Sequence, residues 1–257
     1  MDHSLLLKQL SDLADQKINT LKRRPLAYLL VAMWAGMWVG LAILLILSLA
    51  AQIEPVAPAF VKLIQGLSFG VALILVLLTG AELFTSNNMV MTIGLLNRRI
   101  RPTAALRLWG CCWLGNLLGT ILLALLFTAA GLNSGPVATT FCETALAKAA
   151  GTPLNIFFRG FLCNIAVCLA VLIAYTLPHN MVKVTVCCMC LFILVTVGFE
   201  HSIANMTVYA VSLMGPERSL GLISPALKNL VWATLGNLAG GSLAMALPLY
   251  LQGKRAE

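Results

Sequence analysis

Gly80-Ala-Glu82-Leu-Phe-Thr-Ser-Asn87 and Gly198-Phe-Glu200-His-Ser-Ile-Ala-Asn205 share the pattern G-x-E-x-x-x-x-N, and each interrupts a long apolar run. The two stretches lie 118 positions apart (82 to 200). A second pair of matches, Leu-Gly-Asn116-Leu-x-Gly and Leu-Gly-Asn237-Leu-x-Gly, has the similar offset of 121 (116 to 237). Two matches at nearly one offset indicate an internal repeat.

The composition around these stretches is that of a membrane protein. Of the 257 residues 60% are apolar and 10% charged, against about 45–50% and 25% in an ordinary globular domain. This excludes a soluble enzyme, a disordered chain and a disulfide scaffold. The net charge of +8 would suit nucleic acid, but the basic residues cluster at the ends of apolar runs. The expected partner is therefore a lipid bilayer and not nucleic acid.

Six apolar runs are long enough to cross a bilayer, for which about 20 residues are needed. They cover 26–52, 63–81 with 83–97, 108–131, 160–176, 184–199 with 202–215, and 229–252. Three spans per repeat is an odd number, so the second repeat enters the membrane with opposite topology. The sequence predicts an all-α integral membrane protein of two inverted three-helix repeats, in which the second and fifth helices are broken.

An amphipathic segment, residues 1–25, precedes the membrane domain, residues 26–252, and a short tail, residues 253–257, follows it. Apolar residues of the first segment share one helical face: Leu7, Leu10, Ala14, Ile18 and Leu21. The segment is expected on the cytoplasmic side, either as an interfacial anchor or as a plug of the cytoplasmic mouth.

Glu82 and Glu200 lie where a charge costs about 2.5–3.5 kcal/mol or more. We expect each to hold its loop by accepting bonds from freed backbone groups, with Asn87 and Asn205 as further loop-stabilising residues. Polar residues after each glutamate are candidate caps of a short half-helix: Thr85, Ser86 and Ser202. Two helix N-termini that face a common point inside the membrane would form an anion site.

His201 and Lys148 are the candidate ionisable groups of that site. His201 lies within the second break and has an unperturbed pKa of about 6.5, so it could donate a proton near neutral pH. The alternative is a purely structural histidine. Lys148, in an apolar stretch, would attract anions as a lone ammonium or extend to the lipid headgroups. No histidine joins Cys187, Cys188 and Cys190, so no metal site or cofactor is expected.

These motifs resemble the formate/nitrite transporter family. The Gly80 and Gly198 stretches carry the resemblance, and Ala145-Leu-Ala-Lys148, Phe158-Arg-Gly-x-x-Cys-Asn164 and Asn229-Leu-x-Trp-x-Thr-Leu-Gly-Asn237 support it. The resemblance implies an aquaporin-like arrangement of six spans and a homopentamer with one pore per protomer. The substrates it implies are small monovalent anions (nitrite, formate or hydrosulfide) that cross the bacterial inner membrane.

The family's pore residues correspond to positions of this chain. The resemblance places His201, Thr85, Lys148 and Asn164 along the substrate pore, with Asn164 near the histidine, and apolar constrictions at Phe69, Leu73, Leu83, Phe84 and Leu194. Leu194 replaces the phenylalanine of many members, and Arg159 replaces a lysine. The motifs look more like the nitrite branch than the formate branch. For the pentamer, small residues such as Gly36, Gly40, Gly115 and Gly119 would permit close helix packing.

An anion channel is the first functional hypothesis, with nitrite as substrate and formate or hydrosulfide as alternatives. A membrane-embedded enzyme or haem protein is the second. A bis-histidine haem needs two intramembrane histidines and a zinc protease needs H-E-x-x-H, and neither pattern is present. We therefore expect no enzyme. A passive channel and proton-coupled transport both remain open.

The distribution of Lys and Arg predicts that both termini are cytoplasmic. With this orientation the cytoplasmic segments hold twelve of the 17 basic residues, namely Lys8, Lys17, Lys22, Arg23, Arg24, Arg98, Arg99, Arg101, Arg107, Lys183, Lys254 and Arg255. The other five lie in segments expected outside: Lys62, Lys148, Arg159, Arg218 and Lys228.

Cysteine labelling in whole cells tests this orientation. In a background without native cysteines, a cysteine at Glu217 should react with an impermeant maleimide, and a cysteine at Arg101 should react only after the cells are opened. Labelling of the Arg101 position in intact cells would refute the topology.

Overall fold

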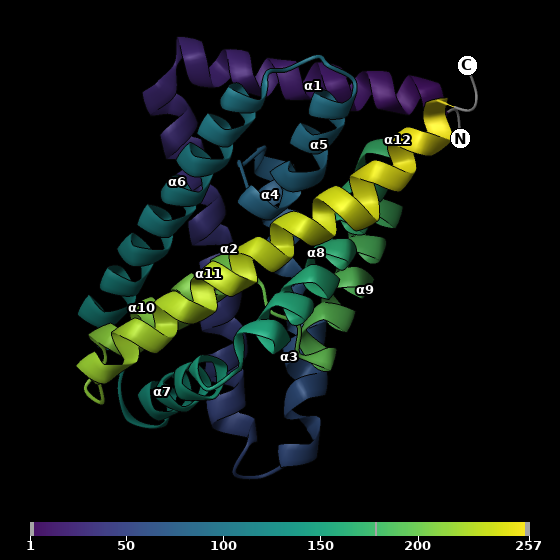
Figure 1. The fold of residues 1–257 in the computed structure, drawn as a ribbon. Coiled ribbons are helices and arrows are strands. Elements are labelled where there is room, and N and C mark those ends of the chain that lie inside the picture. The colour runs from purple at the N-terminus through teal and green to yellow at the C-terminus, as the bar shows by residue number, and fades with distance from the viewer. Residues whose placement is uncertain (1–2, 178, 255–257) are drawn as a thin grey trace.

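The computed structural model describes residues 3–177 and 179–254 (Figure 1). Six helical segments are long and apolar enough to cross a membrane. They are Pro25–Ile53, Pro58–Thr79, Pro102–Ala129, Pro153–Thr176, Asn180–Val197 and Leu220–Lys254. The six predicted spans are therefore confirmed. The predicted tail falls outside the described residues beyond Lys254.

Both predicted interruptions fall at the G-x-E stretches. Helix α4 (Val71–Thr79), which continues α3 (Val61–Phe69), ends at Gly80, and α5 (Phe84–Leu96) begins four residues later. Helix α9 (Asn180–Val197) ends at Gly198, and α10 (Ser202–Met214) follows. Gly80 and Gly198 have φ values of 66° and 84°, a left-handed conformation that favours glycine because it has no Cβ. The glycine of each repeat thus ends the helix.

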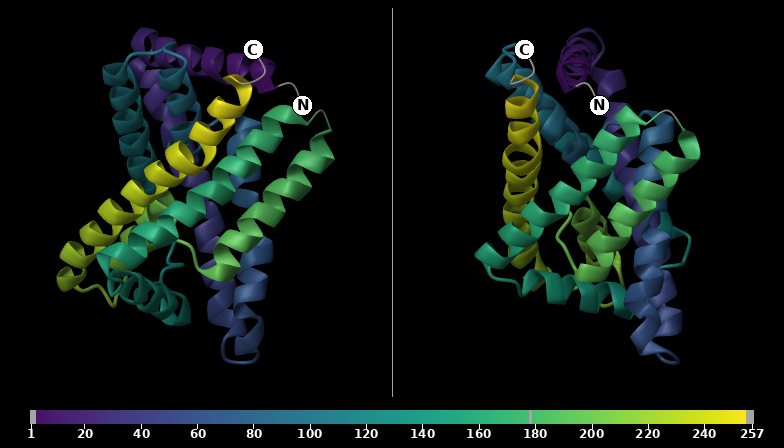
Figure 2. Two further views of the ribbon diagram at one scale, coloured as in Figure 1. Left: turned by 45° about the vertical axis from the view of Figure 1, so that its right-hand side comes forward. Right: turned by 90° about the vertical axis from the view of Figure 1, so that its right-hand side faces the viewer.

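The two half-helices lead to opposite sides of the molecule. Helix α5 packs against the amphipathic α1 (His3–Arg23), and α10 packs against α7 (Gly135–Ala149). Helix α1 lies along the side where both ends of the chain emerge, whereas α7 lies at the other side (Figures 1 and 2). The sequence analysis expected only an external segment where α7 lies. Each half therefore consists of an amphipathic helix followed by three spans.

One contact fits a two-fold relation between the halves. The Trp113 Nε1–H group of α6 (Pro102–Ala129) donates to Thr234 Oγ1 of α11 (Ile223–Ala239) at 3.1 Å. These positions are 121 apart, so they are equivalent in the repeat. A residue that touches its own counterpart lies at a two-fold axis.

Glycines bring the long spans into backbone contact within one protomer. Gly36 of α2 (Pro25–Ile53) lies against the Asn116 backbone, and Gly119 of α6 lies against the Met33 backbone. Gly236 and Gly240 pack in the same way against α8 (Pro153–Thr176). The expectation that Gly36 and Gly119 serve contacts between protomers was therefore wrong, because α2 and α6 of the same chain cover them.

The sixth span differs from its counterpart, α6, in one respect. It runs as α11, a seven-residue π-helix η3 (Gly240–Ala246) and α12 (Leu247–Lys254), whereas α6 is an uninterrupted α-helix. A π-helix is rare and is frequently found at a functional site.

The glycine packing can be tested with two alanines in α6. A Cβ at Gly119 would lie 2.0 Å from the Met33 carbonyl oxygen, whereas a Cβ at Gly110 meets nothing within 4 Å. Gly119→Ala should cost about 1–3 kcal/mol of stability because the backbones must separate. It should lower the thermal unfolding midpoint in detergent. Gly110→Ala, the matched control, should leave it unchanged. Equal midpoints for the two variants would contradict the packing.

Candidate functional site

Each helix break is held by an asparagine from the next long span. Asn116 Nδ2 donates to the carbonyl oxygens of Glu82 and Ala32 at 2.9 and 2.7 Å, and Asn116 Oδ1 accepts the Phe84 N–H at 3.0 Å. One amide side chain thus satisfies both sides of the first break. Backbone groups freed inside a bilayer need such partners, because lipid offers none.

Asn237 repeats this arrangement at the second break. Its Nδ2 donates to the carbonyl oxygens of Glu200 and Gly160 at 2.9 and 2.8 Å, and its Oδ1 accepts the Ser202 N–H at 2.9 Å. The repeated Leu-Gly-Asn-Leu-x-Gly motif contains this asparagine, whose role was not predicted from the sequence. The motif itself was the signal, because a polar residue repeated in two apolar spans requires a buried partner.

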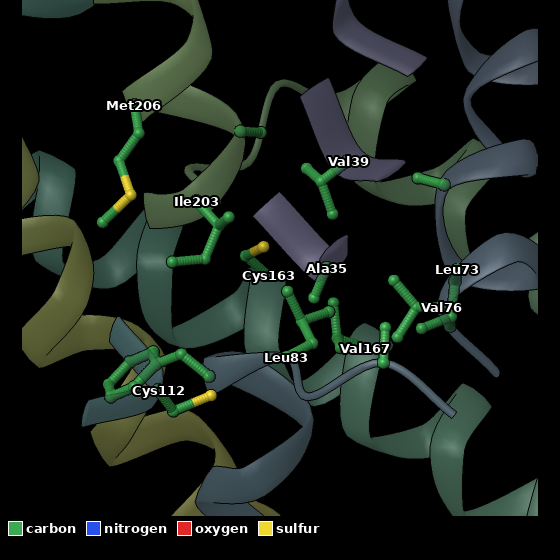
Figure 3. Close-up of a cluster of buried hydrophobic side chains, with 14 of the residues drawn as sticks. Ala35, Val39, Leu73, Val76, Leu83, Cys112, Cys163, Val167, Ile203 and Met206 are labelled. Carbon is green, nitrogen blue, oxygen red and sulfur yellow. The ribbon is translucent and has the colours of Figure 1, made fainter. Parts of the chain in front are cut away.

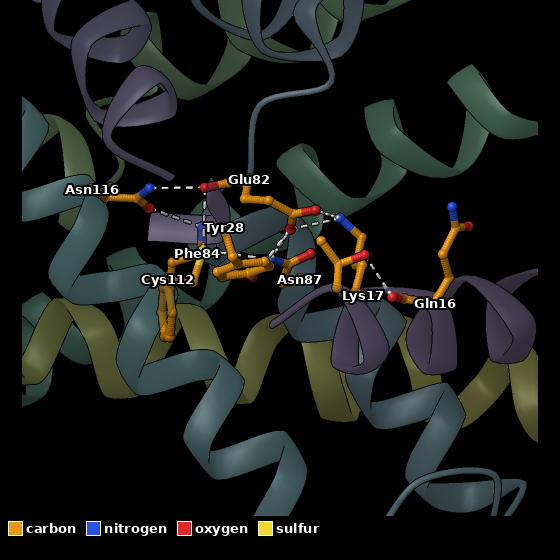
Figure 4. A network of polar contacts seen from close by, with 9 residues as sticks. Gln16, Lys17, Tyr28, Glu82, Phe84, Asn87, Cys112 and Asn116 are labelled. Atoms are coloured by element: carbon orange, nitrogen blue, oxygen red, sulfur yellow. Dashed lines mark hydrogen bonds and ion pairs between the residues drawn. The ribbon is translucent and has the colours of Figure 1, made fainter. Parts of the chain in front are cut away.

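The two glutamate carboxylates accept hydrogen bonds from side chains, whereas the sequence predicted freed backbone groups as their donors. Asn87 Nδ2 donates to Glu82 Oε2 at 2.9 Å, and the amide of Asn205 donates to Glu200 Oε2. The Tyr28 hydroxyl also donates to Glu82 at 3.2 Å. Figure 4 shows the network at Glu82.

A lysine from an amphipathic helix neutralises each glutamate. Lys17 Nζ of α1 lies 2.6 and 2.7 Å from the carboxylate oxygens of Glu82, and Lys148 Nζ of α7 lies 3.2 Å from both oxygens of Glu200. Burial lowers the pKa of Lys17, but the charge of Glu82, the hydrogen bond to Glu82 and the charges of Tyr175 and Cys112 together outweigh burial and raise that pKa. The Lys17 pairing was missed in the sequence.

The expectation that Lys148 is a lone ammonium was therefore wrong. Its charge is paired with a carboxylate that burial would otherwise make costly. The side chain nevertheless remains partly exposed, at 23%, and it lines a cavity of about 180 Å³ with His201 and Thr144.

His201 caps the second half-helix. Its Nδ1 accepts the Ala204 N–H at 3.2 Å, so the neutral ring carries its proton on Nε2. That nitrogen lies 3.1 Å from Thr85 Oγ1 and donates to it, which leaves the threonine O–H as a donor. The predicted caps were wrong: Ser202 is the first residue of α10, and Thr85 and Ser86 lie inside α5, whose N-cap, Leu83, has no side-chain bond.

An apolar chamber of about 10 Å³ adjoins His201, a volume that suits a single water molecule. Four of the predicted constriction residues line it: Phe69, Leu73, Leu83 and Leu194. Phe69, Leu194 and His201 also line the larger cavity and thus separate the two. Figure 3 shows Leu73 and Leu83 gathered with Val167.

Three predicted residues, Thr85, Phe84 and Asn164, line neither of these cavities. Thr85 is buried and contacts the site through His201 Nε2. Phe84 is also buried. Asn164 is buried as well, and its amide donates to the Asn237 carbonyl oxygen at 2.6 Å rather than to the histidine. Among the described residues no group of three or more His, Cys, Asp or Glu could hold a metal ion.

The ion pairs can be tested by removing one partner. Lys148→Met leaves Glu200 buried and unpaired, which should cost about 3–5 kcal/mol and should reduce the yield of folded protein. Arg99→Met, the control, removes an exposed pair with Asp12 and should cost less than about 1 kcal/mol. Equal unfolding midpoints in detergent would contradict the role given to Lys148.

Similarities to known proteins extend over nearly the whole chain. The profile of the formate/nitrite transporter family matches residues 5–251. The nitrite transporter NirC of Escherichia coli is 37% identical over 225 residues, which are 87% of this chain and 82% of that protein. NirC of Salmonella typhimurium is 36% identical over 235 residues, which are 91% of this chain and 86% of that protein.

Solved structures agree in fold. An FNT family ion channel superposes with a TM-score of 0.91 at 33% identity, covering 96% of this chain and 98% of the other. A pentameric formate channel with formate bound gives a TM-score of 0.76 at 27% identity, covering 90% and 98%. The chain belongs to the formate/nitrite transporter family.

Proposed function

We propose that this protein carries small monovalent anions of weak acids, with nitrite as the first candidate, across the bacterial inner membrane. The observation that carries the proposal is the chamber at His201: of its nine described lining residues, His201 alone is polar. A bare anion in such a chamber would lose its hydration at great cost. The neutral conjugate acid would not, so the chamber favours anions that can be protonated.

The cavity at Lys148 is the proposed entrance for the anion. Together with Phe69 and Leu194, His201 forms the boundary between this cavity and the chamber. An anion at this boundary would take the Nε2–H hydrogen bond of His201 in place of Thr85 and could then also accept one from the Thr85 hydroxyl. The Lys148 ammonium lines the cavity and its paired carboxylate does not, so the cation is the charged group that faces the anion. Beyond it, the apolar constriction residues admit the neutral acid.

His201 is the proposed pH-dependent group. A proton on Nδ1 would replace the lone pair that accepts the Ala204 N–H, so the imidazolium loses the helix cap. The imidazolium can give its Nε2 proton to the anion, which leaves as a neutral acid. Water then takes the proton from Nδ1 and returns one to Nε2. The free Nδ1 accepts the Ala204 N–H again. In this scheme the helix cap stabilises the neutral ring. The ring is charged only while it transfers a proton to the anion.

Nitrite is preferred because the NirC relatives are nitrite transporters by name. Formate and hydrosulfide remain alternatives of the same chemical class. A homopentamer is proposed because the formate channel structure is pentameric. The orientation with both termini cytoplasmic rests on the distribution of Lys and Arg.

Flux into proteoliposomes tests the function. Nitrite, formate and hydrosulfide should enter faster as the external pH falls, whereas chloride, which is not the anion of a weak acid, should be excluded. His201→Asn should preserve the oligomer but change selectivity and pH dependence together. Chloride entry equal to that of nitrite would refute the proposed function. An unchanged selectivity and pH profile in His201→Asn would reduce the histidine to a hydrogen-bonding pore wall.

A further inference from the structure

A buried polar stripe on α5 extends away from the Thr85–His201 contact. Thr85, Asn88 and Thr92 follow the helical spacing that places residues on one face. Asn88 is completely buried, and Thr92 Oγ1 lies 2.8 Å from Ser242 Oγ of the π-helix. At its far end α5 meets α1, where Asn97 Nδ2 donates to Ser11 Oγ at 2.7 Å. The stripe thus leads from the centre toward the side with both termini.

Three buried polar atoms beside this stripe need partners. Within residues 3–177 and 179–254, Asn88 Nδ2, Asn88 Oδ1 and Asn164 Oδ1 have no hydrogen-bond partner. The two side chains are close together, because a Cβ at Gly241 would lie 2.6 Å from Asn164 Nδ2 and 2.9 Å from Asn88 Cβ. An unpaired buried amide is costly, and a water molecule is its usual partner.

The repeat shows that the fold does not require this polarity. The positions of α10 equivalent to Thr85, Asn88 and Thr92 carry Ile203, Met206 and Ala210. The carbonyls of Ala32 and Gly160 accept equivalent bonds from Asn116 and Asn237, so α2 and α8 are related by an offset of 128 (32 to 160). Gly36 is then equivalent to Asn164, Ile121 is equivalent to Ser242 at the offset of 121, and a regular α-helix replaces the π-helix. At these three positions α10 carries apolar side chains, although it buries polar ones elsewhere, such as Thr207. The polar residues of the other half therefore serve something other than folding.

We propose that Asn88 and Asn164 bind a bridging water molecule, and that this water, Thr92 and Ser242 form a hydrated column through which protons reach Thr85. Asn88 Nδ2 donates to the water, and the water donates to Asn164 Oδ1. The proposal rests on the proposed function and adds a proton route separate from the path of the anion.

The proton balance of this route is simple. A hydronium ion gives one proton at the Thr92–Ser242 end. The Thr92 hydroxyl donates to the Asn88 carbonyl oxygen at 2.8 Å in the structure, so it must rotate toward the water to pass its proton on. Each hydroxyl or water then accepts one proton and releases another. His201 Nε2 gives its proton to the anion, Thr85 gives its hydroxyl proton to Nε2 across their 3.1 Å contact, and Thr85 receives one proton from the column. The anion leaves as a neutral acid, and the column is unchanged. Asn88 is a positioning residue, since its amide holds the water and does not itself relay protons.

Each helix that packs against α5 near the route carries titratable groups, among them Asp12 and Lys17 on α1, Cys112 on α6, Cys163 and Cys168 on α8, and Tyr250 on α12. Cys163 and Cys168 of α8 are buried nearby, and the Cys168 thiol donates to the Thr85 carbonyl oxygen at 3.7 Å. Lys148 and Glu200 lie on the other side of His201, where they pair with each other. Within the described residues none of these groups joins the stripe by a hydrogen bond to the Asn88, Thr92 or Ser242 side chains.

The experiment compares proton and nitrite entry into proteoliposomes that contain a pH-sensitive dye. Asn88→Met installs the side chain found in the other repeat, and Thr92→Val removes a hydroxyl of the column. Both should slow proton entry with nitrite about fivefold, the effect of one lost hydrogen bond, and should shift the pH profile. Thr207→Val, the matched control, removes a buried hydroxyl of α10 outside the column and should change neither.

A high-resolution map of the wild-type oligomer provides the independent readout. Density for a water between Asn88 Nδ2 and Asn164 Oδ1 is expected, and it should disappear in Asn88→Met. The proposal would be overturned if that density were absent, or if protons entered vesicles with Thr92→Val at the wild-type rate. If Asn88→Met does not assemble, Thr92→Val and Ser242→Ala, at half-buried positions, decide the flux test. Failure of the proposed function would give a different result from failure of the proton route. Vesicles with the wild-type protein would then exclude nitrite, while the density for the water remained.

Discussion

The structure depends on one constraint: a helix broken inside a membrane exposes backbone groups that lipid cannot bond. Asn116 and Asn237 satisfy this constraint, because each forms hydrogen bonds with backbone groups on both sides of a break. Glu82 and Glu200 add carboxylates that bind the half-helices, and Lys17 and Lys148 neutralise them. Amphipathic helices α1 and α7 supply these lysines, so surface helices are part of the interior polar network.

The breaks create the place where chemistry can occur. They bring the start of each half-helix to the centre, and there the two repeats differ in one decisive pair of positions: Leu83 in the first and its equivalent His201 in the second. The leucine lines the apolar chamber, and the histidine borders both the chamber and the cavity at Lys148. The scaffold is thus symmetric while these two positions differ, because the bonds from Asn116 and Asn237 that bridge the breaks do not involve the two side chains.

Comparison of the halves separates polar residues that both repeats share from polar residues that only one repeat carries. The break asparagines and glutamates occur in both repeats, as a structural requirement predicts. Thr85 and Asn88 occur only in the first repeat, and His201 occurs only in the second. Apolar residues stand at the equivalent position of the other repeat in each case. Lys148 belongs to both categories, since it pairs with Glu200 and also lines the cavity beside His201.

Composition and hydropathy alone determined the six spans, and the repeated G-x-E and Leu-Gly-Asn motifs located the breaks and the loop-holding glutamates. These features are local, because the length of a span, a glycine that ends a helix and a charge within an apolar run can each be recognised in a short stretch of sequence. Only the tertiary structure decided which groups meet. It paired Lys17 with Glu82 across 65 positions, made His201 a helix cap and placed Asn164 beside Asn88. Such contacts depend on how distant helices pack, which no local pattern of residues records.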